Sequence, residues 1–283
     1  MEIKTIAVIG AGTMGSGIAQ VAAEAGYHVI LFDTMEASLE KGSKVIEKNL
    51  SRYVEKAKCT KEEAANILTR IECTLEIERI AQADLLIEAI IEKMDIKKEL
   101  YKQLDTICKP TTIFASNTSG LSITELSTVT NRSDKIIGMH FFNPVPVMKL
   151  VELVRGHNTS EATFNTMKVV TEKLGKEMIS VNDAPLFVVN RILVPMINEA
   201  IFVLSEGTAS AEDIDRGMVL GANHPIGPLA LADLVGLDTL LFVQETLYVE
   251  TSDSKYRPCP LLRKLVRAGH LGRKTGKGFY SYQ

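Results

Sequence analysis

Long hydrophobic runs, a basic stripe and clustered cysteines are all missing from this chain of 283 residues. No apolar segment approaches the roughly 18 residues that a membrane-spanning helix needs, and the first expected strand begins within about four residues, without a signal peptide. We therefore expect no membrane association and a cytoplasmic protein. Lysine and arginine are interspersed with acidic residues at a formal net charge of −3, which argues against a nucleic-acid partner.

The four cysteines are far apart, and none forms a CxxC pair. The scattered histidines also lack the i, i+4 spacing of a zinc-binding helix; they are His28, His157, His224 and His270. We therefore expect no metal site, and we expect the cysteines to be reduced and mostly buried. The composition, 46% hydrophobic and 24% charged, is ordinary, and the length suffices for about two domains.

A glycine-rich turn follows the first expected strand, with the sequence Gly10-Ala11-Gly12-Thr13-Met14-Gly15. Gly10 permits a tight strand-to-helix turn, Gly12 lets the backbone approach a pyrophosphate, and Gly15 lets helix and strand pack closely. The unpaired N–H groups of the following helix are suited to bind phosphates. A strand before the glycines and a small-residue helix after them favour a dinucleotide site over a simple turn.

An acidic residue, Asp33, ends the second apolar run, 23 positions beyond Gly10. A carboxylate at that place accepts hydrogen bonds from both ribose hydroxyls of the adenosine and repels a 2′-phosphate. None of the next three residues is an arginine that could accommodate such a phosphate. The sequence therefore predicts NAD as the cofactor in preference to NADP.

Short β-branched runs alternate with helical patterns through residues 1–184. This alternation is typical of an α/β domain of the Rossmann type, with a doubly wound, mainly parallel sheet. The expected strands are Thr5–Ile9, His28–Phe32, Leu85–Ala89, Thr112–Ala115, Lys135–His140, Lys149–Val154 and Glu177–Val181.

A charged insertion lies between Asp33 and the third expected strand, at about residues 36–69. Residues 36–57 carry apolar side chains at helical spacing, and Thr60 is placed to cap a second helix over Lys61–Thr69. The sequence therefore predicts a helical hairpin. Composition alone does not distinguish a functional arm from a solvated one.

From about Pro185 the pattern becomes helical without a convincing strand, which predicts an all-helical C-terminal domain over residues 185–283. A long helix is expected over Phe187–Glu206, ended by Gly207, and Ser210 begins a sequence that resembles a capping box. The apolar surface of the long helix suits either a subunit interface or an internal core helix.

Three groups of polar residues follow expected strands. His140 ends a strand at the carboxyl edge, where ligands of doubly wound sheets bind, and Glu152 lies on the next strand. Imidazole is suited to take the proton of a hydroxyl that loses hydride, and a carboxylate would orient it. Strand-end histidines are more often structural, so both interpretations stay open. The segment 116–120 could position a carbonyl or form an ordinary turn, and Glu88 or Glu92 could approach the cofactor or start a helix.

Several distant segments together resemble the L-3-hydroxyacyl-CoA dehydrogenase family. They are VIGAGTMGSGIAQ at 8–20, ADLLIEAIIE at 83–92, FASNTS at 114–119, GMHFFNPVPVMKLVE at 138–152, VVNRILVPMINEA at 188–200, GANHPIGPLALADLVGLD at 221–238 and GRKTGKGFY at 272–280. The resemblance implies NAD-dependent oxidation of (S)-3-hydroxyacyl-CoA, with 3-hydroxybutyryl-CoA as the expected substrate, and the reverse reduction of acetoacetyl-CoA. It also implies a homodimer or higher homo-oligomer, and a role in fatty acid or butyrate metabolism.

The resemblance assigns roles residue by residue. It implies that His140 is the general acid/base, that Glu152 orients it, and that Ser119 and Asn190 bind the substrate. The implied cofactor contacts are Gly10, Gly12, Thr13, Met14, Gly15, Asp33, Glu92, Lys97, Asn117, Ser119, Asn143 and Lys274. In the family the helical arm lies over coenzyme A, which makes Arg52 and Lys56 candidate phosphate contacts, and the C-terminal domain supplies the substrate cleft and the dimer contact.

The chain departs from the family pattern at two positions. Gly120 replaces a second serine that many relatives have, which leaves Ser119 in place. Leu186 replaces a glycine between the domains, which removes backbone freedom there. Two other functions remain possible on this scaffold: a sugar-acid dehydrogenase acting on L-gulonate, and a crystallin-like structural protein that binds nucleotide without turnover. The charged arm disfavours the first, and the complete set of site residues disfavours the second.

Overall fold

The computed structural model describes residues 2–282, which divide into two compact units with the boundary between Ala184 and Pro185. The first unit is an eight-stranded sheet with helices, and the second is helical. No helix among residues 2–282 is long and apolar enough to cross a membrane. The cysteines are free, but the expectation that most are buried is wrong: Cys108 and Cys259 are buried, Cys59 is half-buried and Cys73 is exposed.

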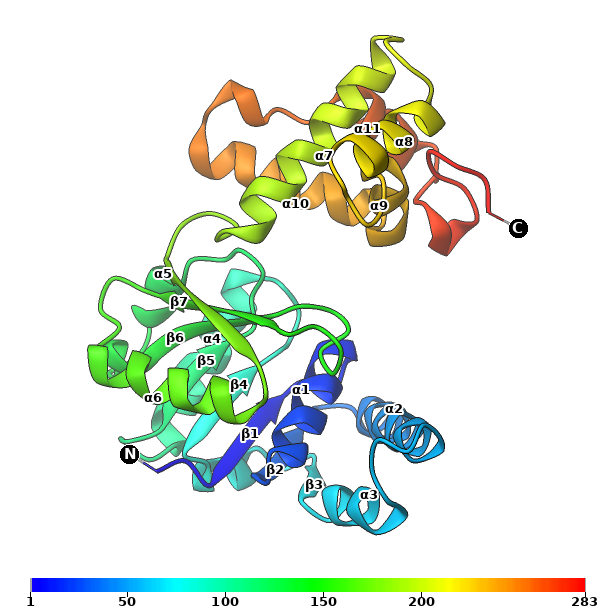
Figure 1. Ribbon diagram of the computed structural model, residues 1–283. Helices are drawn as coiled ribbons and strands as arrows, with labels where there is room; N and C mark the ends of the chain where they lie inside the picture. The colour runs from blue at the N-terminus through cyan, green and yellow to red at the C-terminus, as the bar shows by residue number, and fades with distance from the viewer. Residues whose placement is uncertain (1, 283) are drawn as a thin grey trace. The chain divides into compact units, whose positions relative to one another are not determined.

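The sheet of the first unit has the strand order β3-β2-β1-β4-β5-β6-β7-β8 (Figure 1). Neighbouring strands are parallel throughout, except that β6 and β7 are antiparallel. The strands are β1 Thr5–Ile9, β2 His28–Phe32, β3 Ile71–Thr74, β4 Leu85–Glu88, β5 Ile113–Ser116, β6 Ile136–Phe141, β7 Leu150–Arg155 and β8 Glu177–Asn182. The predicted doubly wound, mainly parallel sheet is confirmed, while the short edge strand β3 is absent from the sequence prediction.

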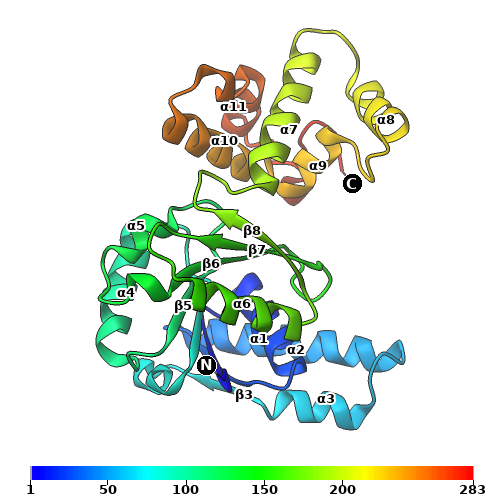
Figure 2. The same cartoon turned by 60° about the vertical axis from the view of Figure 1, so that its left-hand side comes forward.

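Helices cover both faces of this sheet, so its central strands are buried on both sides (Figure 2). One face packs in a single apolar cluster with α1 Thr13–Glu24, α2 Glu36–Glu55, α3 Lys61–Leu68 and α6 Glu161–Lys173. On the other face α4 (Met94–Ile107) reaches the sheet through Tyr101, whose ring meets that of Phe114 edge-on at 5.7 Å. The short helix α5, Ile123–Ser127, contacts α4 and strands β6 and β7.

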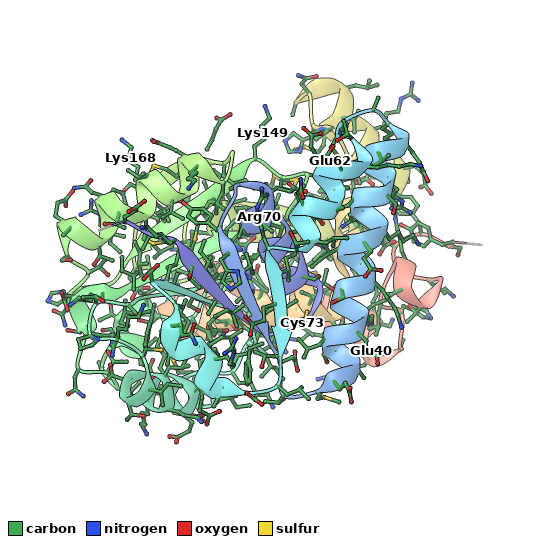
Figure 3. All side chains as sticks on the ribbon, turned by 90° about the horizontal axis from the view of Figure 1, so that it is seen from below. Glu40, Glu62, Arg70, Cys73, Lys149 and Lys168 are labelled. Carbon is green, nitrogen blue, oxygen red and sulfur yellow. The ribbon has the colours of Figure 1, made fainter. Side chains whose placement is uncertain are left out.

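The insertion after Asp33 is a helical hairpin formed by α2 and α3, which lie side by side (Figure 3). Thr60 begins α3 with a capping box, because its side chain accepts from the Glu63 amide while the Glu63 carboxylate accepts from the Thr60 amide. Apolar residues such as Ile46 and Leu50 bury one side of α2 in the core, while Glu40 on α2 and Glu62 on α3 are exposed. The hairpin is therefore anchored to the first unit along one side.

The second unit consists of helices around an apolar core, and no strand occurs among residues 185–282. Its helices are α7 Val189–Ser205, α8 Ala211–Gly221, α9 Pro228–Val235, α10 Leu237–Thr251 and α11 Pro260–Arg267. The predicted long helix is α7, and Ser210 caps α8 by accepting from the Asp213 amide. The predicted helical C-terminal part of the fold is confirmed.

Two buried aspartates fasten the C-terminal segment of this unit. Asp233 accepts from the amides of Phe279 and Tyr280, both at 2.9 Å, and from the Tyr282 hydroxyl. Asp215 accepts from the first amides of α9 and lies 2.8 Å from the Tyr280 hydroxyl. Buried carboxylates whose oxygens accept several hydrogen bonds are stable inside a protein. These two acids therefore hold the C-terminal segment against the helices of the second unit.

Candidate active site

The three glycines of the turn between β1 and α1 differ in why glycine is needed. The backbone conformation requires glycine at position 10, close packing requires it at position 15, and no contact within the protein requires it at position 12. Gly10 has φ of 97°, which favours glycine, and a side chain on Gly15 would collide with the Gly10 carbonyl oxygen. A side chain on Gly12 would meet no protein atom within 4 Å. Gly12 also stands at the N-terminus of α1, whose first turn carries no acidic residue. The open space beside these amides fits a bound phosphate.

Asp33 is held beside this turn by two backbone amides. Its Oδ2 accepts from the Ala11 amide at 2.8 Å, and its Oδ1 accepts from the Met35 amide at 3.0 Å. These bonds fix the carboxylate at the carboxyl end of β2, next to the glycines. The arrangement suits recognition of ribose hydroxyls, as the sequence predicts.

A pocket of about 290 Å³ opens next to Asp33 and Gly10. Apolar side chains form much of its wall, including Ile91, Ile96 and Leu100. Ile91 is 57% exposed and Ile96 is 44% exposed, although both are large apolar residues. Exposed apolar walls around a small pocket are typical of a site for a flat, weakly polar ring. Gly10 and Asp33 of this pocket are predicted from the sequence, but its apolar wall is not; the isoleucines that follow β4 are the available signal.

His140 and Glu152 are direct partners across the antiparallel pair β6 and β7. The Nδ1 atom of His140 lies 2.7 Å from a carboxylate oxygen of Glu152, and both side chains are buried. In neutral imidazole this bond places the proton on Nδ1, so that proton exchange with another molecule takes place at Nε2. The Phe142 ring packs against the imidazole at 4.5 Å between centroids. The structure thus brings together the two residues that the sequence leaves 12 positions apart.

The loop that follows β5 carries Asn117 and Ser119. Its position is fixed by the side chain of Asn117 and by the carboxylate of Glu92. Asn117 accepts from the Phe141 amide through Oδ1 at 2.9 Å, which ties the loop to the strand that carries His140. Glu92 accepts from the Thr118 hydroxyl at 2.6 Å and from the Ser119 amide at 2.8 Å, and the Ser119 hydroxyl is 3.2 Å away. The loop is therefore positioned from both directions.

A buried ion pair lies beneath this loop. The Lys97 ammonium is 2.5 Å from a carboxylate oxygen of Glu88 and 3.3 Å from one of Glu92, and the side chains of Lys97 and Glu88 are at most 1% exposed. The other oxygen of Glu88 accepts from the Ser116 hydroxyl at 2.7 Å. The family resemblance implies that Lys97 contacts the cofactor, and the role of Glu88 is open in the sequence, but neither predicts that the two form a pair.

Other predicted site residues lie elsewhere. Asn143 is exposed just after β6, and Arg52 and Lys56 are exposed near the end of α2, on the helical arm. Asn190 is the second residue of α7, and Lys274 bonds both carboxylate oxygens of Asp238 at 2.5 and 2.7 Å. Asn190 and Lys274 thus belong to the second unit. Burial opposes the effect, but the Lys274 ammonium holds the pKa of Asp238 below its usual value.

One further residue that sequence reasoning missed is Asp183, near the end of the first unit. Its carboxylate accepts from the Ser122 hydroxyl and the Thr124 amide, both at 2.7 Å, and so caps α5. Leu186 follows with φ of 61° and Phe187 with φ of 59°, both in the left-handed region that favours glycine. A glycine at position 186 would adopt this conformation without strain.

Comparison with known proteins decides the family. A family model described as “3-hydroxyacyl-CoA dehydrogenase, NAD binding domain” matches residues 5–184, and one described as “3-hydroxyacyl-CoA dehydrogenase, C-terminal domain” matches residues 187–282. The chain belongs to the 3-hydroxyacyl-CoA dehydrogenase family. The resemblance inferred from the sequence is thereby confirmed.

Several known proteins match this chain over 98% or more of its length. The chain is 56% identical to a probable 3-hydroxybutyryl-CoA dehydrogenase of Bacillus subtilis, covering 100% of this chain and 99% of the relative. It is 51% identical to a 3-hydroxybutyryl-CoA dehydrogenase of Clostridioides difficile, covering 98% and 99%. The crystal structure of (S)-3-hydroxybutyryl-CoA dehydrogenase from Ralstonia eutropha superposes with a TM-score of 0.98 at 52% identity, covering 100% of both chains.

The family assignment makes NAD the cofactor of the first unit, and the residues present fit it. The glycine turn leaves space that fits phosphates at the start of α1, the Asp33 carboxylate beside it is suited to accept from ribose hydroxyls, and the adjoining apolar pocket suits the adenine ring. No group of three or more His, Cys, Asp or Glu side chains within residues 2–282 is arranged to hold a metal ion.

Proposed function

We propose that this protein catalyses the NAD-dependent oxidation of (S)-3-hydroxybutyryl-CoA to acetoacetyl-CoA and the reverse reduction. The observation that carries the proposal is the buried contact of 2.7 Å between His140 and Glu152 at the cofactor-binding edge of the sheet. An alcohol that loses hydride must also lose its hydroxyl proton, and imidazole exchanges protons well near neutral pH. The names of the relatives supply the acyl group of the substrate.

In the oxidation, His140 accepts the proton of the 3-hydroxyl group through Nε2. NAD, when bound, would supply the acceptor for the hydride that leaves C3 of the substrate. Glu152 holds the Nδ1 proton of the imidazole and stabilises the imidazolium that forms, because its buried charge lies directly against the ring. In the reduction His140 returns its proton to the 3-oxo group, so each step is reversed.

The remaining roles concern binding and orientation. Gly12, Thr13 and Met14 offer their backbone to the phosphates, and Asp33 accepts from the ribose. The Ser119 hydroxyl and the Asn190 amide hold the oxygens of the acyl group, and Asn117, Asn143, Glu92, Lys97 and Lys274 bind the nicotinamide half of the cofactor. Arg52 and Lys56, exposed on the arm, attract the phosphates of coenzyme A.

The experiment that tests this proposal is an NADH absorbance assay with two substrates. Acetoacetyl-CoA is expected to be reduced by NADH, while L-gulonate with NAD⁺ is expected to give no signal above background. Turnover of L-gulonate alone would identify a sugar-acid dehydrogenase. NADH binding without turnover of either substrate would favour the structural, crystallin-like protein and overturn the proposal.

We also propose that the protein forms a homo-oligomer, most simply a homodimer, through its second unit. Large apolar side chains are exposed there, including Ile192 at 66%, Phe242 at 53% and Val249 at 70%. Exposed apolar residues gathered in one unit are typical of a subunit interface. Light scattering after gel filtration is expected to give twice the chain mass or more, and a monomer at micromolar concentration would contradict the proposal.

A further inference from the structure

Three charged side chains form a buried charge cluster, which we define as Glu88, Lys97 and Glu92. Glu88 ends β4, Glu92 lies in the connection that follows, and Lys97 is in the first turns of α4. The Lys97 ammonium is 2.5 Å from Glu88 and 3.3 Å from Glu92. The side chains of Glu88 and Lys97 are 0% and 1% exposed, while that of Glu92 is 29% exposed.

Within residues 2–282, Glu88 and Glu92 accept every hydrogen bond that they form and donate none, as expected of ionised carboxylates. Glu88 accepts from the Ile90 amide at 2.8 Å, from Lys97 and from the Ser116 hydroxyl. Glu92 accepts from the hydroxyl of Thr118 and the amide of Ser119. One ammonium therefore faces two carboxylates, and the cluster carries a net charge of about −1 in a largely water-excluded position.

The cluster lies on the same sheet face as the catalytic pair. Side chains alternate between faces along a strand, and Ile87, Ala115, Met139 and Val151 all belong to the apolar cluster of the opposite face. Their neighbours Glu88, Ser116, His140 and Glu152 therefore share the other face. Glu88 pairs with Ser116, and Ser116 pairs with Gly138, which is two residues before His140. Glu88 is therefore two strands, or about 10 Å, across the sheet from His140 and two residues, or about 7 Å, along it.

Hydride transfer changes the charge of the nicotinamide ring, which is positive in NAD⁺ and neutral in NADH. The ring must lie beside the carbon whose hydroxyl proton passes to His140, and hence near the loop 116–119 that both His140's strand and Glu92 hold. A fixed negative charge close to that position favours the positive form, because the interaction is weakly screened in a partly buried site.

We propose that the buried charge cluster discriminates between the two redox states of the cofactor, by strengthening the binding of NAD⁺ relative to NADH. This inference rests on the proposed function, which sets the nicotinamide beside His140. Glu92 is the member most exposed toward a ligand, while Lys97 and Glu88 hold it in place. The cluster thus raises the affinity for the oxidised cofactor and lowers the driving force of the oxidation on the enzyme, in proportion to its charge.

The test compares the dissociation constants of NADH and NAD⁺ at constant pH and ionic strength. NADH fluorescence gives the first, and displacement of NADH by NAD⁺ gives the second; the chain has no tryptophan to interfere. In Glu92→Gln, which keeps the size of the side chain and removes its charge, the ratio Kd(NAD⁺)/Kd(NADH) is expected to rise about tenfold. Glu88→Gln is expected to raise it in the same direction.

Two control variants separate charge from geometry. Glu92→Asp keeps the charge and shortens the side chain, so it is expected to weaken both cofactors together and leave the ratio within about twofold. Glu99→Gln removes an exposed charge from the same helix α4, and solvent screening is expected to leave the ratio unchanged. The charge of Glu152 is the same in all four variants, so a change in the ratio reports the cluster.

The outcomes are distinguishable. A ratio that rises in Glu92→Gln but not in Glu92→Asp supports the proposal. Equal weakening of both cofactors in Glu92→Gln would show that the cluster only shapes the loop, which overturns the proposal. If the unmodified protein binds NADH but turns over no acyl-CoA, the proposed function fails while the binding ratio still tests the cluster.

Discussion

Both units of the molecule bury carboxylates, but they surround them with different partners. In the second unit Asp233 and Asp215 accept from backbone amides and tyrosine hydroxyls, none of which changes its protonation near neutral pH. In the first unit Glu152 faces an imidazole, and Glu88 faces an ammonium that it shares with Glu92. The first set fastens chain segments together, while the second places charge and an exchangeable proton at one edge of a sheet.

The difference teaches that burial of an acid does not by itself indicate chemistry. Asp233 and Glu152 are equally hidden, at 1% and 0% exposure. What distinguishes Glu152 is a titratable partner and a position beside the carboxyl ends of parallel strands, the edge at which we propose that the cofactor binds. The following predictions test whether the two kinds of buried acid can be separated by experiment.

The largest effect is expected at His140, the proposed acid/base. His140→Gln keeps a polar side chain but cannot exchange a proton near neutral pH, so turnover should fall by about 10²-fold or more. NADH binding should be retained, because the glycine turn and Asp33 are untouched. His157→Gln, at an exposed histidine of the same unit, is the matched control and should leave turnover unchanged. Undiminished turnover in His140→Gln would refute its role as the acid/base.

The second prediction concerns Asp233, which holds the C-terminal segment of the second unit. Asp233→Asn replaces one accepting oxygen by a donor that opposes either the Phe279 amide or the Tyr280 amide, so the free energy of unfolding should fall by about 2 kcal/mol. Turnover per folded molecule should stay within about twofold. Chemical denaturation and assays on the same samples measure both, with Asp253→Asn, at a side chain that is 42% exposed, as the control. A loss of turnover without loss of stability would place Asp233 among the functional acids.

The third prediction concerns the pH dependence of stability that arises from Tyr280, the partner of Asp215. Burial, reinforced by the hydrogen bond and the charge of Asp215, raises the pKa of Tyr280 well above its usual value. The folded state therefore holds the phenol proton more tightly than the unfolded state, and this contribution is complete below about pH 10 and is lost as the pH rises above it. Tyr280→Phe should lower the free energy of unfolding by about 1 kcal/mol at pH 7.

Above pH 10 the unfolding free energy of Tyr280→Phe should fall less steeply than that of the unmodified protein. Tyr248→Phe, at a tyrosine of α10 that is 38% exposed, serves as the control. Parallel pH profiles for Tyr280→Phe and the unmodified protein would contradict the assignment. Urea denaturation at a series of pH values supplies the measurement.

The smallest effect is expected where the two units join. Leu186 is buried with φ of 61°, so Leu186→Gly and Leu186→Ala both lose its apolar contacts, but only glycine relieves the backbone strain. Leu186→Gly should therefore be about 1 kcal/mol more stable than Leu186→Ala. The same pair at exposed Val169 in α6 should show the reverse order, because glycine weakens a helix. If the glycine variant were less stable than the alanine variant at both sites, strain at Leu186 would be refuted.

The sequence predicts the fold class because its signals are local. The glycine turn, the buried runs and the caps at Thr60 and Ser210 each depend on a few neighbouring residues, and the structure has them where expected. Strand β3 is missed because Ile71–Thr74 is short and only partly buried at the sheet edge, so pairing with β2 rather than its own pattern makes it a strand. The reversal of β7 also depends on pairing that spacing does not reveal.

The site is predictable in part for the same reason. Residue types at strand ends point to His140, Glu152 and Asp33, because parallel strands bring their carboxyl ends to one edge. The pairing of Lys97 with Glu88 is not readable, since it depends on how α4 turns back over β4. Likewise Asp183 gives no sequence signal, because its partners lie about 60 positions earlier in the chain.

The antiparallel step between β6 and β7 has a consequence for how proton exchange could arise and persist. His140 and Glu152 occupy facing positions of one hydrogen-bonded ladder, so backbone pairing alone sets their separation. Neither a ligand nor the second unit has to arrive before the acid and the imidazole are assembled. Sequence changes in the helical unit should therefore leave the proposed proton transfer intact, while a one-residue slip of β7 should abolish it by turning Glu152 to the opposite face.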